Sequence, residues 1–207
     1  MHELIAFIGV GNMGNPMAEN LIKAGKKVRV FDVSNEMIEK AKKKKFDIAN
    51  TIDDLLDGSV STVITMLPAG KHSKEVYLGK DGIINKVHKD CLLIDCSTID
   101  IKTSVEIGNK AKDKGIKMID APVSGGVMGA KNATLTFLVG GSKDAFDLAK
   151  PLLEIMGKNI FHAGELGCGN GAKICNNMAL GISMIGASEA LMLAKRLNID
   201  IKKVHEI

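Results

Sequence analysis

Short apolar runs alternate with longer amphipathic stretches along most of this 207-residue chain. Apolar runs of this length, closed by glycine or polar residues, indicate buried strands, whereas a repeat near 3.6 residues indicates helices. The predicted strands are residues 4–8, 28–32, 61–67, 91–95, 116–121, 134–141 and 159–164. The predicted helices are residues 12–24, 35–44, 51–57, 101–115 and 142–156. This alternation predicts an α/β fold of the Rossmann type, a doubly wound and mostly parallel sheet wrapped by helices.

The regular alternation of predicted strands and helices stops after residue 121. Residues 122–133 have the composition of a loop, and residues 167–197 form an apolar stretch that other helices would have to cover. We therefore expect residues 1–163 to form the Rossmann-type domain. Residues 164–207 are expected to be a long interdomain helix and the start of an all-helical substrate and dimerisation domain, whose remainder lies outside this sequence.

Composition and charge narrow the class of protein. Hydrophobic residues make up 45% and charged residues 25%, which suits a globular core. The net charge of +4 and only six Phe and one Tyr argue against nucleic-acid binding. The lysine run 42–45 is read as a solvated helix end. With no leader before residue 4 and no run of 18 apolar residues, we expect no membrane partner and a location in the bacterial cytoplasm or the mitochondrial matrix.

The four cysteines are not spaced as a metal site. Cys91, Cys96, Cys168 and Cys175 form no C-x-x-C pair, so free thiols and no metal are expected.

A glycine-rich turn lies between the first strand and the first helix. Gly9, Gly11 and Gly14 have the G-x-G-x-x-G spacing, in which the glycines permit a tight turn, the approach of a pyrophosphate and close packing of helix on strand. The helix N-terminus would face the phosphates. The whole loop, with Val10, Asn12 and Met13, is therefore a candidate dinucleotide site. A tight connection without a ligand is the alternative.

Asp32 follows Gly14 by 18 residues and ends the second strand. A carboxylate there accepts hydrogen bonds from the ribose hydroxyls of the adenosine and repels a 2′-phosphate, so NAD is favoured over NADP. Arg29 would favour NADP if it turned inward. An Asx-turn before the next helix is the alternative role of Asp32.

A second group of polar residues lies in the carboxyl-terminal half. Ser124, with the N–H groups of Gly125 and Gly126, predicts a concavity that binds a carboxylate. Lys173 and Asn177 are four residues apart, and therefore on one face of an otherwise apolar helix. A lysine there is costly unless it is satisfied or functional, although one near a helix end can instead extend its ammonium group into water.

These motifs together resemble the β-hydroxyacid dehydrogenase family. The resemblance covers nearly the whole chain and rests on FIGVGNMGNPMAENL, TMLP, LLIDCSTID, DAPVSGGV, LTFLVGG and GAKICNNM with ISMIGASEA, in this order. Val10 replaces the more frequent leucine of the family, which should not disturb the turn.

The resemblance implies a role for individual residues. Lys173 corresponds to the catalytic lysine, Asn177 to a substrate-orienting asparagine, and Ser124 with Gly125 to the carboxylate anchor. Leu67, Pro68, His72 and Thr98 match positions that contact NAD. The implied reaction is hydride transfer from a substrate carbinol to NAD, with Lys173 as general base for the hydroxyl proton.

Two features distinguish branches of the family. Asn176 stands where decarboxylating 6-phosphogluconate relatives have histidine, and the apolar pair Val127 and Met128 suits a methyl-branched substrate. The expected substrate is therefore 3-hydroxyisobutyrate, an intermediate of valine breakdown, with tartronate semialdehyde as the alternative. The family also implies a homo-oligomer for a full-length form. A NAD-binding module with little turnover remains the alternative from another functional class.

Overall fold

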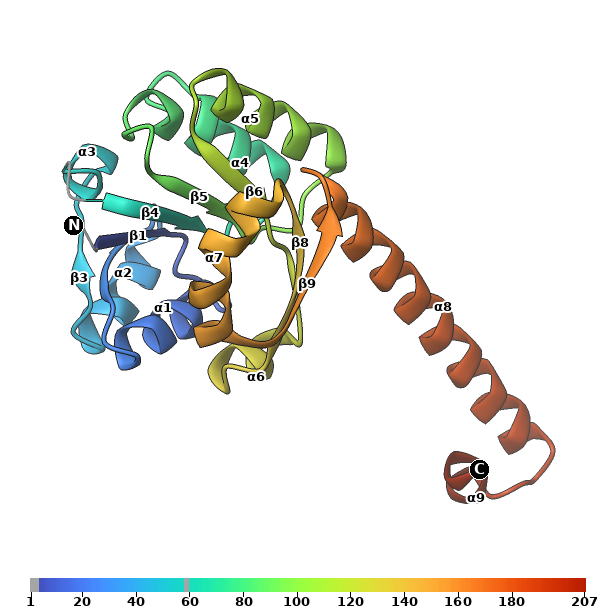
Figure 1. Cartoon of the computed structure of the whole chain (residues 1–207). Helices are drawn as coiled ribbons and strands as arrows, with labels where there is room; N and C mark the ends of the chain where they lie inside the picture. The colour runs from blue at the N-terminus through green and yellow to red at the C-terminus, as the bar shows by residue number, and fades with distance from the viewer. Residues whose placement is uncertain (1–3, 58–59) are drawn as a thin grey trace. The chain divides into compact units, whose positions relative to one another are not determined.

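The computed structural model describes residues 4–57 and 60–207. Its described part contains a sheet of nine strands, with helices on both faces (Figure 1). The strand order is β3-β2-β1-β4-β5-β6-β8-β7, and β9 pairs with β8. The strands are β1 Leu4–Ile8, β2 Lys27–Phe31, β3 Asp47–Ile48, β4 Val60–Thr65, β5 Leu92–Asp95, β6 Lys117–Asp120, β7 Val123–Ser124, β8 Leu135–Gly140 and β9 Gly157–Gly164. The predicted α/β Rossmann-type fold is confirmed.

The strands from β3 to β6 in this order are parallel, whereas β8 runs antiparallel to β6 and β7. Strand β9 is again parallel to β8. The chain therefore leaves the parallel pattern after β6, at the point where the rhythm of the sequence changes.

Successive side chains of a strand point to opposite faces of the sheet, and both faces are covered by apolar cores. In β1, Ile5 and Phe7 belong to one apolar core, while Ala6 and Ile8 belong to the other. Such strands are apolar throughout because neither face meets water. Burying a large side chain of this kind stabilises the fold by roughly 1.5–3 kcal/mol. Packing on both faces holds the strands in place, and this positions the loops that follow the strand ends.

The helices follow from capping as well as periodicity. Side chains of Ser34, Thr51, Asp100 and Ser142 accept a hydrogen bond from a backbone N–H in the first turn of a helix. These helices are α2 Asn35–Lys43, α3 Ile52–Leu55, α5 Ile101–Asp113 and α7 Lys143–Met156. Helix α1, Gly14–Lys23, is followed by Gly25 with a φ of 81°, a left-handed conformation that glycine adopts readily at the end of a helix.

Two segments differ from the sequence prediction. Residues 122–133, expected to be a loop, contain β7 and the short helix α6 Gly126–Lys131. Pairing of Ser124 with Thr136 of β8 and burial of Ala130 override the low propensity of this glycine-rich segment. Helix α4 Gly70–Leu78 and the 3-10 turn Ile83–Asn85 occupy a segment for which no element was predicted.

Two compact units divide the chain, Met1–Lys173 and Ile174–Ile207. The predicted domain boundary after residue 163 lies before this division. The first unit extends further because the beginning of α8, Cys168–Arg196, packs on the sheet: a side chain at Gly169 would lie 2.4 Å from the carbonyl oxygen of Leu138. The predicted domain limits and roles stay a prediction.

The second unit contains the rest of α8 and α9, Ile201–Glu206. Its apolar side chains are largely exposed, among them Met178, Ile182 and Ile185. Helix α8 is long and apolar enough to cross a membrane by length and composition, but core helices of soluble proteins pass the same test.

Candidate active site

The carboxyl ends of the parallel strands lie in register. Across neighbouring strands, Ile8 of β1 is paired with Phe31 of β2 and with Thr65 of β4. Asp95 of β5 is paired in turn with Thr65 and with Asp120 of β6. The loops that follow these strands therefore emerge side by side at one edge of the sheet. Ligands of open α/β sheets bind at this edge. The predicted cofactor residues and Ser124 all lie in or near these loops.

Each glycine of the G-x-G-x-x-G motif meets a different environment. Gly9 has a φ of 93°, and a Cβ there would lie 2.3 Å from the carbonyl oxygen of Met66. A Cβ at Gly14 would lie 1.8 Å from the carbonyl oxygen of Gly9, because α1 packs closely on β1. A Cβ at Gly11 would point into open space. This pattern fits NAD, since a pyrophosphate needs an open approach at Gly11 and a rigid turn behind it.

The matched pair Gly11→Ala and Gly14→Ala should separate cofactor binding from folding. At Gly11 the added methyl group meets no protein atom, so we expect unchanged thermal stability with NAD affinity reduced about tenfold or more. At Gly14 the methyl group overlaps the backbone and should cost about 1–3 kcal/mol of stability. Thermal unfolding and NAD titration measure both effects. Full NAD affinity in the Gly11 variant would contradict the assignment of this loop.

Asp32 connects the glycine loop to the turn before α2. Its Oδ2 accepts a hydrogen bond from the N–H of Val10 at 2.8 Å, and its Oδ1 accepts one from the N–H of Ser34 at 2.8 Å. The Asx-turn is therefore present, and the carboxylate retains lone pairs for ribose hydroxyls. Arg29 instead pairs with Asp47 at 2.9 Å and Asp57 at 2.7 Å, so its guanidinium group is engaged away from this role.

The loops after β4 and β5 are tied together. The N–H of Leu67 donates to the Oγ of Ser97 at 2.8 Å, and the N–H of Ser97 donates to the Oδ1 of Asp95 at 2.9 Å. These bonds hold the segment that carries Leu67 and Pro68 against the one that carries Thr98. Pro68 and Thr98 are exposed and accessible to a ligand.

His72 lies in the first turn of α4. Its buried Nδ1 has no hydrogen-bond partner among the described residues. Its predicted contact with NAD stays a prediction.

Asp95 is buried, and its Oδ1 also accepts a hydrogen bond from the hydroxyl of Thr65 at 2.8 Å. Burial raises the pKa of Asp95 above its ordinary value of 3.8, against the opposing effect of hydrogen bonds from Ser97 and Thr65. The folded state therefore retains a proton that the unfolded chain releases. As a result, Asp95 makes the free energy of unfolding fall as pH rises from 3.8 through the higher folded-state pKa.

Asp95→Asn should remove this pH dependence, because asparagine keeps the accepting oxygen and carries no charge. We expect a flatter curve of unfolding free energy as the pH rises above 3.8, measured by urea denaturation. The exposed Asp113→Asn variant serves as the control. Parallel curves for the wild type and Asp95→Asn would contradict the prediction.

The Ser-Gly-Gly segment has backbone geometry that only glycine adopts readily. Ser124 pairs with Thr136 of β8, and the chain then passes through Gly125 with a φ of 123° and Gly126 with a φ of 60°. Ser124 is half-buried, whereas both glycines are exposed. The segment is thus open to a ligand, as the predicted carboxylate anchor requires.

A buried polar network fixes the start of α8. The Oδ1 of Asp120 accepts a hydrogen bond from the N–H of Gly167, and its Oδ2 accepts one from the N–H of Asn170, each at 2.7 Å. The Nδ2 of Asn170 also donates to the Oδ2 of Asp120 at 3.3 Å, and the Oδ1 of Asn170 accepts from the N–H of Ile99 at 3.0 Å. We call these contacts the Asp120 network. It joins the loops after β5 and β6 to the helix that carries Lys173.

Lys173 follows Asn170 by one turn of α8 and is only 9% exposed. It makes no ion pair or hydrogen bond with any described residue, and burial lowers its pKa below the ordinary lysine value of 10.5. An unpaired amine with a lowered pKa, on a largely buried side chain, has the properties of a general base. Asn177 lies four residues further along α8 and is exposed, in the second compact unit.

The sequence interpretation did not assign a role to Asp95, Asp120 or Asn170. A signal was present, since β5 and β6 each end in an aspartate after apolar residues, and Asp32 directly follows β2 in the same way. Their partners come from distant segments, however, and pattern alone does not identify them. In the described part of the chain, no group of three or more His, Cys, Asp or Glu side chains is placed to hold a metal ion.

Comparison with known proteins gives concordant matches. Residues 4–164 match the model of the NAD-binding domain of 6-phosphogluconate dehydrogenase. A 3-hydroxyisobutyrate dehydrogenase of Pseudomonas aeruginosa is 48% identical over 98% of the chain and 68% of that protein. A NAD-dependent L-serine dehydrogenase of the same organism is 43% identical over 98% of the chain and 68% of that protein.

A solved structure extends the similarity to the fold. The 3-hydroxyisobutyrate dehydrogenase of Mycobacterium tuberculosis, described with L-serine, has a TM-score of 0.90 and 39% identity over 97% of the chain and 67% of that protein. The chain thus spans about two thirds of the length of these proteins, and between 60% and 62% of some other curated relatives.

Proposed function

The chain belongs to the family of 3-hydroxyisobutyrate dehydrogenases and related NAD-dependent hydroxyacid dehydrogenases, and on this premise we propose that it oxidises 3-hydroxyisobutyrate to methylmalonate semialdehyde. The single observation that carries the proposal is Lys173. Its side chain is largely buried and its amine is unpaired, and the Asp120 network fixes the preceding turn of α8 beside loops that emerge from the cofactor edge of the sheet.

NAD, when bound, supplies the acceptor for the hydride that leaves the carbinol carbon. The chain's own residues would do the rest. The glycine loop and Asp32 would hold the dinucleotide, with Leu67, Pro68 and Thr98 toward its nicotinamide half and His72 at a further contact. Ser124 and the N–H groups of Gly125 and Gly126 would hold the substrate carboxylate through charge-assisted hydrogen bonds.

Lys173 would take the hydroxyl proton as the hydride departs, so that the carbinol becomes an aldehyde. In the reverse direction the same ammonium group would return the proton to the developing alkoxide. The lowered pKa favours this role because more of the amine is unprotonated near neutral pH than in an ordinary lysine. Asn177 would orient the substrate hydroxyl from the same face of α8, four residues beyond Lys173.

A second candidate substrate is L-serine. A relative that is 43% identical is named for its dehydrogenation, and L-serine accompanies the similar solved structure. L-Serine is also a small β-hydroxyacid, but its amino group would lie where the methyl group of 3-hydroxyisobutyrate lies. The apolar side chains of Val127 and Met128 favour the methyl group. Valine catabolism is the corresponding proposed pathway.

Steady-state kinetics with each substrate and each cofactor test the proposal. We expect kcat/KM to be highest for 3-hydroxyisobutyrate with NAD, and lower for L-serine and for tartronate semialdehyde in the reductive direction. A higher kcat/KM for L-serine would transfer the assignment to serine oxidation. A preference for NADP would contradict the proposed role of Asp32.

A further inference from the structure

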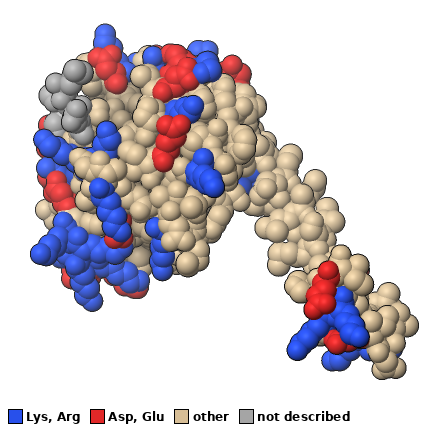
Figure 2. Space-filling model, turned by 60° about the horizontal axis from the view of Figure 1, so that its bottom comes forward, with Lys and Arg blue, Asp and Glu red and all other residues tan. Residues whose placement is uncertain are grey.

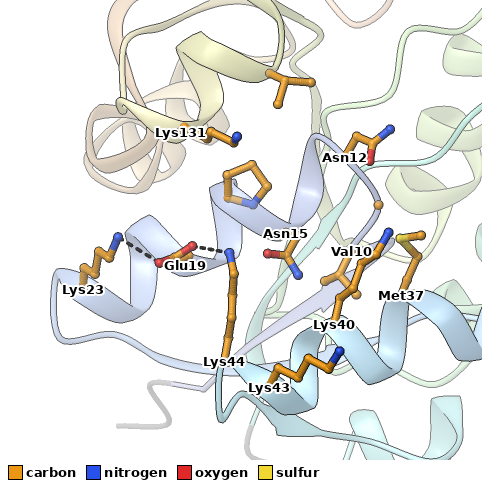
Figure 3. A pocket seen from close by; sticks show the side chains of 13 residues that line it. Val10, Asn12, Asn15, Glu19, Lys23, Met37, Lys40, Lys43, Lys44 and Lys131 are labelled. Carbon is orange, nitrogen blue, oxygen red and sulfur yellow. Dashed lines mark hydrogen bonds and ion pairs between the residues drawn. The ribbon is translucent and has the colours of Figure 1, made fainter.

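A basic pocket of about 620 Å³ lies on the outer side of the glycine loop, between α1, α2 and α6 (Figure 3). We call it the lysine pocket. Its lining comprises Val10, Gly11, Asn12, Asn15, Pro16, Glu19, Lys23, Met37, Lys40, Lys43, Lys44, Val127 and Lys131. The residues proposed for the adenosine and nicotinamide ends, Asp32, Leu67 and Thr98, are not among these. The pocket therefore shares only the glycine loop with the dinucleotide site.

The lining is strongly cationic. Five lysines face one carboxylate, that of Glu19, which already pairs with both Lys23 and Lys44. The ammonium group of Lys44, with a smaller effect from that of Lys23, holds the pKa of Glu19 below its ordinary value. Lys40 pairs with Glu36, whereas Lys43 and Lys131 have no ion pair among the described residues. The excess of positive charge would be relieved by an anion.

Positive side chains also gather around this pocket on the molecular surface. Figure 2 shows lysine and arginine atoms concentrated at the lower left of the face in view, over the part of the molecule that contains α1 and α2. The lysine run 42–45 contributes to this region from the C-terminal end of α2. Its side chains are exposed, as predicted, but two of them line a concave site, so the run is more than a solvated helix end.

A buried donor without a partner provides an independent observation. Asn15 is 9% exposed, lines the pocket, and its Nδ2 makes no hydrogen bond with any described residue. In Figure 3 its amide lies between α1 and the side chains that extend from α2. An unsatisfied buried donor costs about 1–3 kcal/mol, and a ligand oxygen that accepts from it removes this cost.

We propose that the lysine pocket is a second anion site, which binds a small phosphate-bearing molecule with at least two phosphoryl groups while NAD occupies its own site. Phosphoryl oxygens are strong acceptors for the Asn15 amide, and lysines serve as point charges around phosphate. The lysines come from three separate helices, so a diphosphate or triphosphate, whose charge is spread over several phosphoryl groups, fits the distribution of charge. The pocket volume lies within the range of small-molecule sites.

Calorimetric titration of the chain with inorganic tripolyphosphate at low salt, with and without saturating NAD, tests this proposal. We expect binding in both conditions, weakened but not abolished by NAD, because the two sites share the glycine loop and both ligands are anions. No binding, or binding that saturating NAD abolishes, would overturn the proposal, because the pocket would then be part of the dinucleotide site.

Charge-matched variants establish the location. Lys43→Ala with Lys131→Ala should weaken tripolyphosphate binding about tenfold or more and leave NAD affinity unchanged. The control replaces Lys110 and Lys112, exposed lysines on α5, and removes the same charge from a different helix. An equal loss of tripolyphosphate affinity in the control would show that the effect comes from the net charge of the protein, and would overturn the proposal.

Asn15→Leu gives a second readout that does not depend on charge. Leucine is similar in size and removes the unpartnered donor, so the melting temperature without ligand should rise while tripolyphosphate binding weakens. Unweakened binding would contradict the role of Asn15. A single-stranded RNA that bound more tightly than tripolyphosphate, with the same dependence on Lys43 and Lys131, would overturn the assignment to a small molecule.

Discussion

Lys173→Ala should lower kcat for 3-hydroxyisobutyrate oxidation by a factor of about 10² to 10⁴ while NAD affinity stays unchanged. The amine is the unpaired base that the proposed chemistry requires, carried on a largely buried side chain, and no hydrogen bond links it to the glycine loop or to Asp32. Stopped-flow or steady-state measurement of NADH formation gives kcat, and calorimetry gives NAD affinity. Loss of kcat without loss of NAD binding is the signature of a group that acts on the substrate.

Lys173→Arg provides the matched control for charge and bulk. Arginine retains the positive charge but does not lose its proton near neutral pH, so it should be nearly as inactive as alanine. If Lys173→Arg kept most of the activity, Lys173 would bind the substrate by charge and would not transfer a proton. If Lys173→Ala kept its kcat, the lysine would only extend from the end of a core helix into water.

Asp120→Ala should lower the free energy of unfolding by about 3–5 kcal/mol, and should lower kcat more than NAD affinity. The substitution leaves the N–H groups of Gly167 and Asn170 and the Nδ2 of Asn170 without their shared acceptor inside the protein. The start of α8 would then lose its connection to the end of β6, and Lys173 would lose its fixed position. The glycine loop does not depend on this network.

Asp120→Asn separates the contribution of charge from that of shape. Asparagine retains one accepting oxygen but places its NH2 group opposite one of the backbone N–H donors. We therefore expect a smaller loss of unfolding free energy, about 1–3 kcal/mol. Denaturant unfolding measures stability, and the exposed Asp113→Ala variant controls for the loss of a carboxylate. Equal proportional losses of kcat and NAD affinity would contradict a specific role in positioning Lys173.

The first half of the fold was predictable because its determinants are local. Apolar runs predicted β1, β2, β4, β5 and β6, and the ends of two helices carry residues suited to them, the capping Ser34 before α2 and the left-handed Gly25 after α1. The glycine spacing predicted both the open approach at Gly11 and the close packing at Gly14. In each case a residue's own conformational or capping preference agrees with its tertiary environment.

Features that depend on tertiary contacts were not predictable. The short helix α6 was missed because two of its six residues are glycines, which have low helix propensity, and its Ala130 is buried only in the folded chain. Asp120 and Asn170 are 50 residues apart, and their bond exists because β6 and α8 meet. The lysine pocket likewise collects Lys23, Lys43 and Lys131 from three helices. Local sequence patterns do not predict which distant residues meet in the folded chain.

The pH dependence of kcat/KM tests the central claim, that Lys173 is the base, most directly. A general base must be unprotonated, so the rate should rise with pH through a pKa below the ordinary lysine value of 10.5, in the direction that burial shifts Lys173. This limb should be absent from Lys173→Ala, and small primary amines added to that variant should restore part of the rate. An identical limb in Lys173→Ala and the wild type would contradict the account, because another group would then be titrating.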